Sequence, residues 1–446
     1  MRKQILLVIA LSGIISYQGL QAQQVIANAY GVVATQVDSA FKAGVPNTGR
    51  IWGYVFGDWY YKSHADSLNR GGNNQYTGIP QNRNAFQFRR VYLGYDYNIS
   101  KKFAAELLLA AEDNFPAFNP PSATTVNGDE TFNNKLSFFI KLANIRWKNI
   151  WNGTDLVVGE QATPSFPLLS EKIWNYRSIE RTIADIRRTP SYDLGAGLQG
   201  VFDPKTKNFG YDILIANGTS AKAASNSYKW FYGDIYYWFL HKKLVVDIYA
   251  DYQRLNWQQG WHHDRQMWKG YAAYTTPALT VGVEAFVNKI RADTKATLIA
   301  GGADTIDTKA QGISFYVHGN IVPNKLRFFA RVDRYNPNKN VDNNTYNAYS
   351  GVSSPNGYNS NAYKLTYSAS TGAPTAATPT GDVTSKETFM TFGLDFTPYK
   401  GVHFMPNIWY THYKSQLTDP PGMTPGTSDA NHDLVYRLTF YFVFGK

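Results

Sequence analysis

Alternation of apolar and polar residues with a period of two runs through most of this 446-residue chain and limits the folds open to it. Clear examples are 279–285 (Leu-Thr-Val-Gly-Val-Glu-Ala) and 313–318 (Ile-Ser-Phe-Tyr-Val-His). Successive side chains of a β-strand point to opposite faces, so each such segment predicts a strand with one apolar face. We predict about 16 strands, at 51–62, 84–98, 102–113, 135–147, 154–161, 191–202, 208–218, 229–241, 243–254, 266–276, 278–290, 310–321, 324–334, 387–398, 401–413 and 433–444.

The connections between these strands alternate between short and long along the chain. Bacterial outer-membrane barrels have an even number of strands, with short turns facing the periplasm and long loops facing outside. The fold class predicted is therefore all-β: a transmembrane antiparallel β-barrel with both termini in the periplasm. The short turns are expected at 99–101, 203–207, 240–242, 322–323 and 399–400, and the long loops at 63–83, 114–134, 162–190, 219–228, 255–265, 291–309, 335–386 and 414–432.

The composition separates this barrel from two other classes. Charged residues make up only 17% of the chain, against about 25% in an average soluble domain, while 15% are aromatic. No apolar run of about 20 residues follows residue 22, which excludes a helical membrane protein. A soluble β-sandwich or propeller would bury its apolar faces in a core. Charges inside strands, such as Glu284 and Arg331, favour a water-filled lumen instead.

The two ends of the chain indicate export. Met1, Arg2 and Lys3 precede an apolar run, and the layout is that of a secretory signal peptide over residues 1–22. We expect a short periplasmic segment at 23–49 and the barrel at 50–446. In the last strand, an apolar or aromatic residue at every second position from Tyr436 to Phe444 resembles the C-terminal strand by which outer-membrane barrels are recognised. The bacterial outer membrane is the predicted location.

The net charge and the absence of known motifs limit the ligands and activities to be expected of this protein. The formal charge is +11, and loss of Arg2 and Lys3 with the signal lowers it to +9. Such an excess suits nucleic acid, an anionic membrane or an anionic solute, and export makes nucleic acid the weakest of these. The chain has no Cys and no recognisable phosphate loop, nucleophile elbow or zinc motif, and His262 and His263 are adjacent in a polar segment. We expect no enzyme activity, catalytic residue, metal or cofactor.

The third long loop, 162–190, carries the candidate site. Residues 173–188 lack Pro and Gly and are predicted to be helical toward their end. At about 100° per residue, Arg177, Arg181 and Arg188 fall on one side of such a helix. Guanidinium groups stay charged and bind phosphate or carboxylate, so this side would form an anion-binding constriction. Lys172 and Arg187 add to the positive field.

The opposite side of that helix is apolar, because Ile179, Ile183 and Ile186 cluster there. If the loop folds into the lumen, the isoleucines would pack on the inner wall and the arginines would face the pore. The alternative is that the arginines pair with Glu171, Glu180 and Asp185 and leave a neutral, structural loop. Inward wall positions carry both signs, so selectivity should come from the loop. The basic wall candidates are Lys141, Lys269, Arg327 and Arg331.

Two stretches of the first half resemble the phosphate-selective porin family and its Bacteroidetes-type relatives. One is Phe86-Gln87-Phe88-Arg89-Arg90-Val91-Tyr92-Leu93-Gly94 before Lys101-Lys102-Phe103. The other is Val158-Gly159-Glu160-Gln161, followed by Pro164, Phe166, Glu171 and Ser178-Ile179-Glu180-Arg181. The resemblance covers about residues 50–200. It implies a 16-stranded homotrimeric barrel whose third loop narrows a pore for phosphate, polyphosphate or other small anions.

The function expected is passive diffusion of small hydrophilic solutes across the outer membrane, with a preference for anions such as phosphate. The expected partners are those solutes, outer-membrane lipid and two further copies of the chain. A hydrophobic-solute channel would need an apolar hatch, for which residues 23–49 are the candidate segment. A surface-binding or adhesin barrel would use the loop 335–386. An energised transporter would need about 22 strands and a plug domain, for which the chain has no room.

Overall fold

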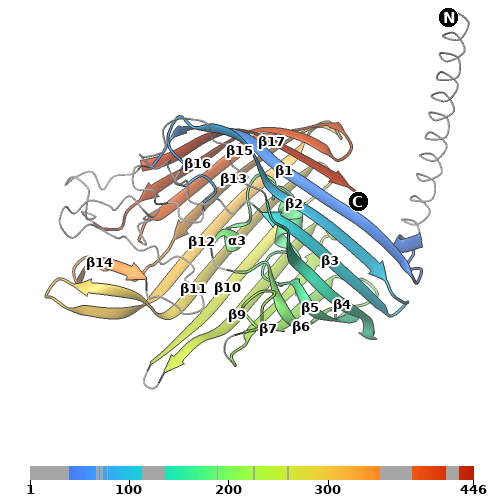
Figure 1. The fold of residues 1–446 in the computed structure, drawn as a ribbon, viewed down its shortest axis with the longest axis horizontal. Helices are drawn as coiled ribbons and strands as arrows, with labels where there is room; N and C mark the ends of the chain where they lie inside the picture. The colour runs from blue at the N-terminus through green and yellow to red at the C-terminus, as the bar shows by residue number, and fades with distance from the viewer. Residues whose placement is uncertain are drawn as a thin grey trace, which may run out of the picture.

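Sixteen strands of the computed structural model form one closed antiparallel barrel (Figure 1). The structure describes residues 40–66, 70, 74–77, 79–112, 136–187, 189–224, 227–258, 261–351, 384–417 and 431–445. Its elements are β1 (Thr48–His64), β2 (Asn84–Asn98), β3 (Phe103–Glu112), β4 (Phe139–Trp151), β5 (Thr154–Ala162), α2 (Ser170–Trp174), α3 (Ile183–Arg187), β6 (Tyr192–Val201), β7 (Phe209–Ala216), β8 (Trp230–Phe239), β9 (Leu244–Gln258), β10 (Trp261–Thr275), β11 (Leu279–Leu298), β12 (Ala303–Val322), β13 (Leu326–Asn336), β14 (Tyr346–Gly351), β15 (Lys386–Tyr399), β16 (Val402–Lys414) and β17 (Asn431–Phe444).

The ladder closes where the first strand meets the last. β1 pairs with β17 from Gly53 opposite Phe444 to Lys62 opposite Val435, and β1 also pairs with β2. β14 lies outside this ring and pairs with β11. A closed ring satisfies backbone N–H and C=O groups between neighbouring strands and leaves no free edge. The predicted all-β barrel of 16 strands is confirmed.

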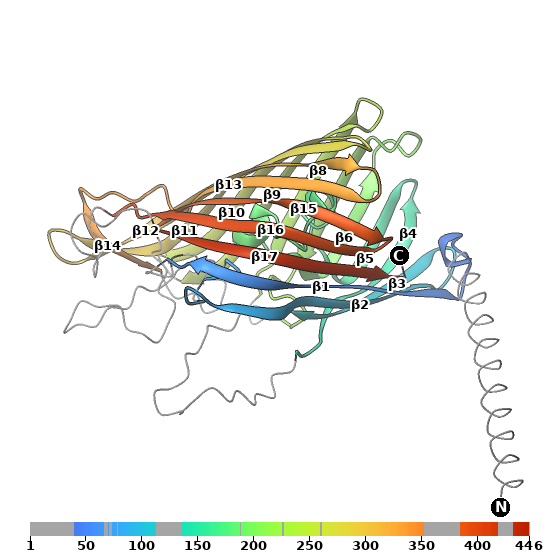
Figure 2. The same cartoon turned by 90° about the horizontal axis from the view of Figure 1, so that it is seen from above.

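The two ends of the barrel differ, as the alternation of connections predicted. β14 lies at one end of the barrel, and the start of β1 and the end of β17 lie at the other (Figure 2). The short turns at this second end join β2 to β3, β4 to β5, β6 to β7, β8 to β9, β10 to β11, β12 to β13, and β15 to β16. This arrangement gives the barrel a polarity along its axis.

The two faces of each strand have opposite character. On β12, Ile313 and Phe315 are each 49% exposed on the outer face, whereas Ser314 and Tyr316 between them are 3% and 4% exposed. A period of two places an apolar band outside and polar or aromatic side chains inside. Charged residues such as Glu284 therefore line the interior, as the sequence predicted.

Two predicted loops, 255–265 and 291–309, are wrong. β9 and β10 run to Gln258 and from Trp261, and β11 and β12 run to Leu298 and from Ala303. The β11–β12 hairpin continues beyond the sixteen-strand ladder, where β14 pairs with its Thr294–Leu298 segment. Strands that leave the membrane no longer need an apolar face, so these polar extensions have the composition of loops.

Several further predictions lie wholly or partly outside the described residues, among them the loop 114–134 and parts of the loops 63–83, 219–228 and 414–432. The proposed signal 1–22 and most of the segment 23–49 belong to residues 1–39, and β1 begins at Thr48 instead of residue 50. Of the predicted loop 335–386, residues 352–383 lie outside the description. The described part of that loop contains the short strand β14.

The helices α2 and α3 belong to the connection between β5 and β6 and lie within the ring of strands (Figure 1). α2 contacts β10 and β11, and α3 contacts β12. Among the described residues, the structure has no helix that is long and apolar enough to cross a membrane.

The outer apolar band can be tested with one charge placed at two depths. Phe392, at the middle of β15, and Phe404, near the start of β16, are 59% and 43% exposed on the outer face. We expect Phe392→Lys to lower the free energy of unfolding by about 2–4 kcal/mol and Phe404→Lys by about 0–1 kcal/mol, because the cost of a cation falls from the midplane to the interface. Denaturant titration in lipid vesicles measures both. Equal losses would contradict the placement of the band.

Candidate functional site

The connection between β5 and β6, residues 163–191, folds into the barrel and is called here the third loop. Its isoleucines are buried against the inner wall: Ile179 is 0%, Ile183 1% and Ile186 7% exposed. Ile179 packs in a cluster with Tyr271 and Phe329, and Ile183 packs in a second cluster with wall residues of β7–β13. The predicted packing of the isoleucines on the wall is confirmed.

A glycine on the wall makes room for this packing. Gly312 of β12 faces the lumen, and a Cβ atom there would lie 2.5 Å from the ring of Phe286 and 2.9 Å from Cδ1 of Ile183. Both distances are shorter than a van der Waals contact, so a larger residue at this position would push the side chains of Phe286 and Ile183 out of their observed positions. The close packing of α3 on the wall therefore depends on the absence of a side chain at position 312.

The expected single cationic face of one helix is wrong. α2 ends at Trp174, and Asn175 follows it in the left-handed conformation (φ 57°) with its N–H bonded to the carbonyl of Glu171 at 3.0 Å. Asn is a common terminator of this kind because it tolerates positive φ. α3 begins only at Ile183, which confirms helix toward the end of the segment. Arg188 lies outside the described residues.

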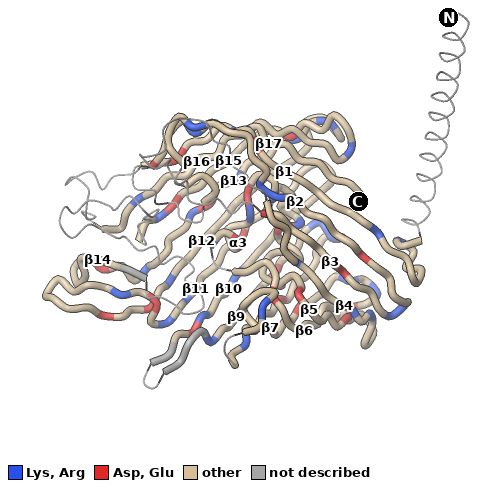
Figure 3. Tube along the Cα trace, in the orientation of Figure 1, with Lys and Arg blue, Asp and Glu red and all other residues tan. Residues whose placement is uncertain are grey.

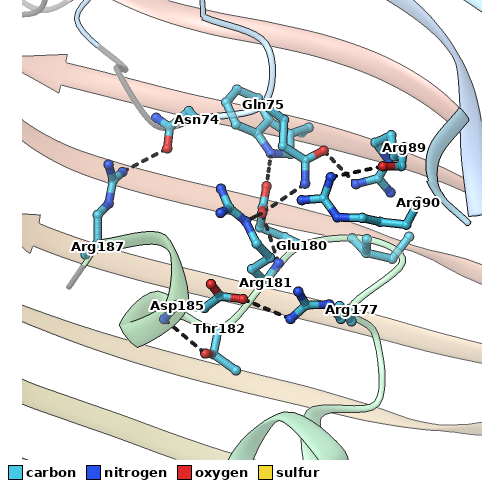
Figure 4. Close-up of polar contacts among 12 residues, drawn as sticks. Asn74, Gln75, Arg89, Arg90, Arg177, Glu180, Arg181, Thr182, Asp185 and Arg187 are labelled. Atoms are coloured by element: carbon cyan, nitrogen blue, oxygen red, sulfur yellow. Dashed lines mark hydrogen bonds and ion pairs between the residues drawn. The ribbon is translucent and has the colours of Figure 1, made fainter. Parts of the chain in front are cut away.

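Arg177 lies between two carboxylates of its own loop. It forms ion pairs with Glu171 and, at 2.9 Å, with Asp185, and its side chain is 14% exposed (Figure 4). Tyr92 on β2 and Glu112 on β3 are close enough to interact with it electrostatically. Arg177 therefore faces the β2–β3 side of the lumen with its charge largely matched by neighbouring acids.

Glu180 is the centre of a buried polar network that connects the third loop to the β1–β2 connection and to β16. Its carboxylate accepts hydrogen bonds from the Gln75 side chain (3.0 Å), the Trp409 indole (3.0 Å) and the backbone N–H of Arg181 (2.9 Å), as Figure 4 shows in part. Burial alone would raise the pKa of Glu180, but Arg181 and the indole bond outweigh it and lower that pKa. Glu180 is therefore ionised, and its charge offsets the cations around it.

Two arginines of the barrel wall anchor the same segment through its carbonyl oxygens. Arg89 of β2 pairs with Asp58 of β1 at 2.5 Å and donates to the carbonyl of Ser178. Arg437 of β17 donates to the carbonyl of Ile179 at 3.1 Å. The wall cations thus donate hydrogen bonds to backbone carbonyl groups of the loop that lie outside α2 and α3.

The remaining predicted loop cations lie on different sides of the third loop. Arg187 is buried, with 5% of its surface exposed, and it forms an ion pair with Glu387. Its guanidinium group lies over the Tyr335 ring, 4.7 Å from the ring centroid. Arg181 is partly exposed, at 22% of its side chain, and lies 3.8 Å from Glu180. Lys172 is exposed and interacts electrostatically with Asp212 and Glu106 of the wall. Only Lys172, Arg177 and Arg181 are thus accessible from the lumen among the described loop cations.

The four wall candidates face the lumen, and each has a polar partner. Figure 3 shows basic and acidic residues interspersed along the strands around α3. Three of the four partners are carboxylates, and the fourth is a histidine. The contacts are Lys141 with Glu112 (2.5 Å), Lys269 with Asp247 (2.8 Å), Arg331 with Asp333 (2.5 Å) and Arg327 with His318 (3.0 Å).

A second inward-folding segment was not predicted from the sequence. Tyr76, in the connection between β1 and β2, is 0% exposed, and its hydroxyl donates to Asp58 at 3.0 Å and lies 3.3 Å from Arg437. Lys62 donates to its carbonyl at 2.6 Å. A single tyrosine among Gly, Asn and Gln residues gives no periodic signal, so only the structure reveals it.

The third loop packs closely against one side of the inner wall, and its other side carries exposed charged residues. A cavity of only about 10 Å³ lies between the loop and β13–β16, lined among others by Arg187, Tyr335 and Trp409. That space holds at most about one water molecule. On the other side, Lys172 is exposed, and Arg146 and Asp155 on β4 and β5 keep 32% and 27% of their side chains exposed. Water inside the barrel therefore meets the face of the loop that carries Lys172 and Arg177.

The fold matches solved outer-membrane proteins at low sequence identity. The outer membrane channel DcaP of Acinetobacter baumannii is 9% identical, with 90% of this chain and 98% of that one covered and a TM-score of 0.54. OmpT of Vibrio cholerae (8% identity; 89% and 98% covered) and OmpF of Salmonella typhi in complex with daunomycin (10%; 89% and 98%) each give a TM-score of 0.49. No family model matches the sequence, and no curated protein does. The likeness to DcaP shows a shared barrel fold.

The role of Glu180 in holding the third loop can be tested by neutralising it. We expect Glu180→Gln to lower the free energy of unfolding by about 3–5 kcal/mol, because buried cations lose their compensating charge. Denaturant titration of the detergent-solubilised barrel measures this loss. Lys172→Gln, which changes an exposed charge of the same loop, is the control and should stay within about 0.5 kcal/mol of the parent. Equal stability of all three proteins would show that the network does not hold the loop.

Proposed function

We propose that the protein is a passive diffusion channel for small hydrophilic solutes in the bacterial outer membrane, with its termini in the periplasm. The observation that carries this proposal is the opposite character of the two barrel faces: an apolar outer band and an inner face of charged and polar residues. Such an inner face is stable only if water or paired polar groups occupy the lumen. The third loop narrows that lumen from one side, which supports a constriction instead of an open tube.

We propose that the constriction prefers anions only weakly. Lys172, Arg177 and Arg181 supply the positive charge on the accessible face of the third loop, but Arg177 is paired with two carboxylates and Lys172 faces Asp212. Paired charges cancel at distances beyond a few ångströms, so their effect on a passing ion is reduced. The alternative of pairing within the loop thus describes the contacts better than an unpaired arginine stripe.

Phosphate as a solute and assembly as a homotrimer rest on the family resemblance of residues 50–200. We propose both for this protein. Arginines hold phosphate through charge-assisted, bidentate hydrogen bonds, and Arg181 is the loop arginine whose side chain is most exposed among those described. A phosphate ion entering the lumen would meet Arg181 and Lys172 before the buried Arg187.

A second candidate function is surface binding, favoured by the extension of β11, β12 and β14. This extension stands beyond the ladder of the sixteen strands, at the end opposite the start of β1 and the end of β17 (Figure 2). A folded three-stranded surface can present a fixed epitope outside the cell, whereas a channel does not require one. The channel remains the first proposal because the polar inner face and the inward loop need a lumen to act in.

Conductance and ion preference test the channel proposal directly. The protein is reconstituted into planar bilayers, and the reversal potential is measured across a KCl gradient with and without added phosphate. We expect stable conductance with a small anion preference. The variant Lys172→Ala/Arg177→Ala/Arg181→Ala should shift the preference toward cations by several-fold, because carboxylates of the loop and wall lose their partners.

The control variant removes three cations outside the lumen. Lys205, Lys207 and Lys242 lie in short turns and are exposed, so Lys205→Ala/Lys207→Ala/Lys242→Ala should leave the preference unchanged. Absence of conductance would overturn the channel and favour surface binding. Unchanged preference in the loop variant would retain a channel but remove the third loop from its selectivity.

A further inference from the structure

A groove runs over the outer, lipid-facing side of the barrel between β9 and β16. Its volume is about 880 Å³. Its walls are exposed apolar side chains such as Trp268 (59%) and Val287 (54%), and small residues form its floor. At Gly270 an added Cβ would have no atom within 4 Å, which shows how open the floor is. We call this feature the outer groove and define it by Ile248, Trp268, Gly270, Ala285, Val287 and Ile313.

Cations line the end of the outer groove that lies toward the long loops. Arg334, Lys386 and Lys414 belong to the groove lining, and all three are exposed. We call these three residues the cationic row. Lys386 and Lys414 are register partners, and Ile313, Arg334, Thr388 and His412 follow one another across four neighbouring strands. The row therefore comes from three strands that are adjacent in the sheet.

The cationic row marks the edge of the apolar band. One step of two residues toward the short turns, the outward positions on the same strands are Phe315, Val332, Met390 and Tyr410, again in register. Phe315, Val332 and Met390 are exposed apolar side chains of the lipid-facing band. Cations immediately beyond such a band lie at the level of lipid headgroups.

The neighbouring acids point the other way. Asp333 and Glu387 precede or follow row residues in sequence, but both are buried in the lumen and pair with Arg331 and Arg187. Within the described part of the chain, no ion pair joins Arg334, Lys386 or Lys414 to an acidic side chain. The row therefore presents positive charge outward.

We propose that the cationic row and the outer groove bind a phosphate-bearing anionic lipid, with the phosphate on the row and an acyl chain in the groove. Arg334 and the two lysines supply charge-assisted hydrogen bonds to phosphate oxygens. The apolar groove below them needs to be filled with hydrocarbon, since a void loses dispersion contacts. A second copy of this chain seated here would have to bury three cations, which is costly without matching acids. The inference rests on the membrane placement in the proposed function and is independent of ion preference.

Native mass spectrometry of the full-length protein in detergent tests this site, with phosphatidylglycerol and phosphatidylcholine as the added lipids. We expect Arg334→Ala/Lys386→Ala/Lys414→Ala to weaken phosphatidylglycerol binding on the order of 100-fold, at roughly 1 kcal/mol per cation. Phosphatidylcholine binding should change little, because its headgroup carries no net charge. The matched control Lys172→Ala/Arg177→Ala/Arg181→Ala removes the same charge inside the lumen and should bind phosphatidylglycerol like the parent.

A second variant tests the acyl-chain part of the proposal with the cations intact. Gly270→Phe fills the floor of the groove at an outward position with open space, and it should weaken binding of phosphatidylglycerol. Millimolar inorganic phosphate should not displace the lipid. Circular dichroism and unchanged conductance of both variants in bilayers confirm that the barrel is folded, and conductance also separates failure of this site from failure of the channel.

Four outcomes would overturn the proposal. These are unchanged phosphatidylglycerol binding in the row variant, an equal loss in the lumen control, displacement by inorganic phosphate, and a change of oligomer mass without a change in bound lipid. The second would indicate a general effect of net charge, the third a site for free anions, and the fourth an interface between copies of the chain.

Discussion

Hydrogen bonding of backbone N–H and C=O groups between neighbouring strands is the interaction on which this structure depends, because no water is available to these groups in the hydrocarbon of a membrane. A sheet that spans hydrocarbon must close on itself, and the pairing of β1 with β17 achieves this closure. Closure then dictates the alternation of side chains, because each strand has one face in lipid and one in the lumen. The apolar band and the charged interior both follow from this alternation.

A closed barrel creates a polar interior that must itself be satisfied, and the third loop does this on one side. Its isoleucines pack on the wall, and the carbonyl oxygens of Ser178, Ile179 and Arg181 accept hydrogen bonds from wall arginines, namely Arg89, Arg437 and Arg331. Arginine suits this role because its planar fork can donate to a carbonyl and a carboxylate at once. These three wall arginines therefore hold the third loop in place, which leaves them less available to solutes in the lumen.

The fold was largely predictable from the sequence because period-two alternation is a local signal, repeated in every strand. The polar ends of β11 and β12 were mistaken for a loop, since strands outside the membrane lose the apolar half of that signal. At the site, the burial of the isoleucines was predictable from spacing. A single helix with a cationic face does not form, because Asn175 adopts the left-handed conformation and ends α2; Asn is a recognisable stop signal of this kind. The partners of Glu180 come from residues such as Gln75 and Trp409, hundreds of positions apart, which no local pattern reveals.

The anchoring of the third loop has a consequence for the order of assembly. Its polar partners include Arg89 of β2, Trp409 of β16 and Arg437 of β17, which come together only when the seam between the first and last strands is formed. Before that moment the loop has its isoleucine wall but lacks the groups that satisfy Glu180 and the carbonyls of Ser178 and Ile179. The narrowing of the lumen is therefore a late event in biogenesis, and a barrel caught with an open seam would hold a loosely docked loop.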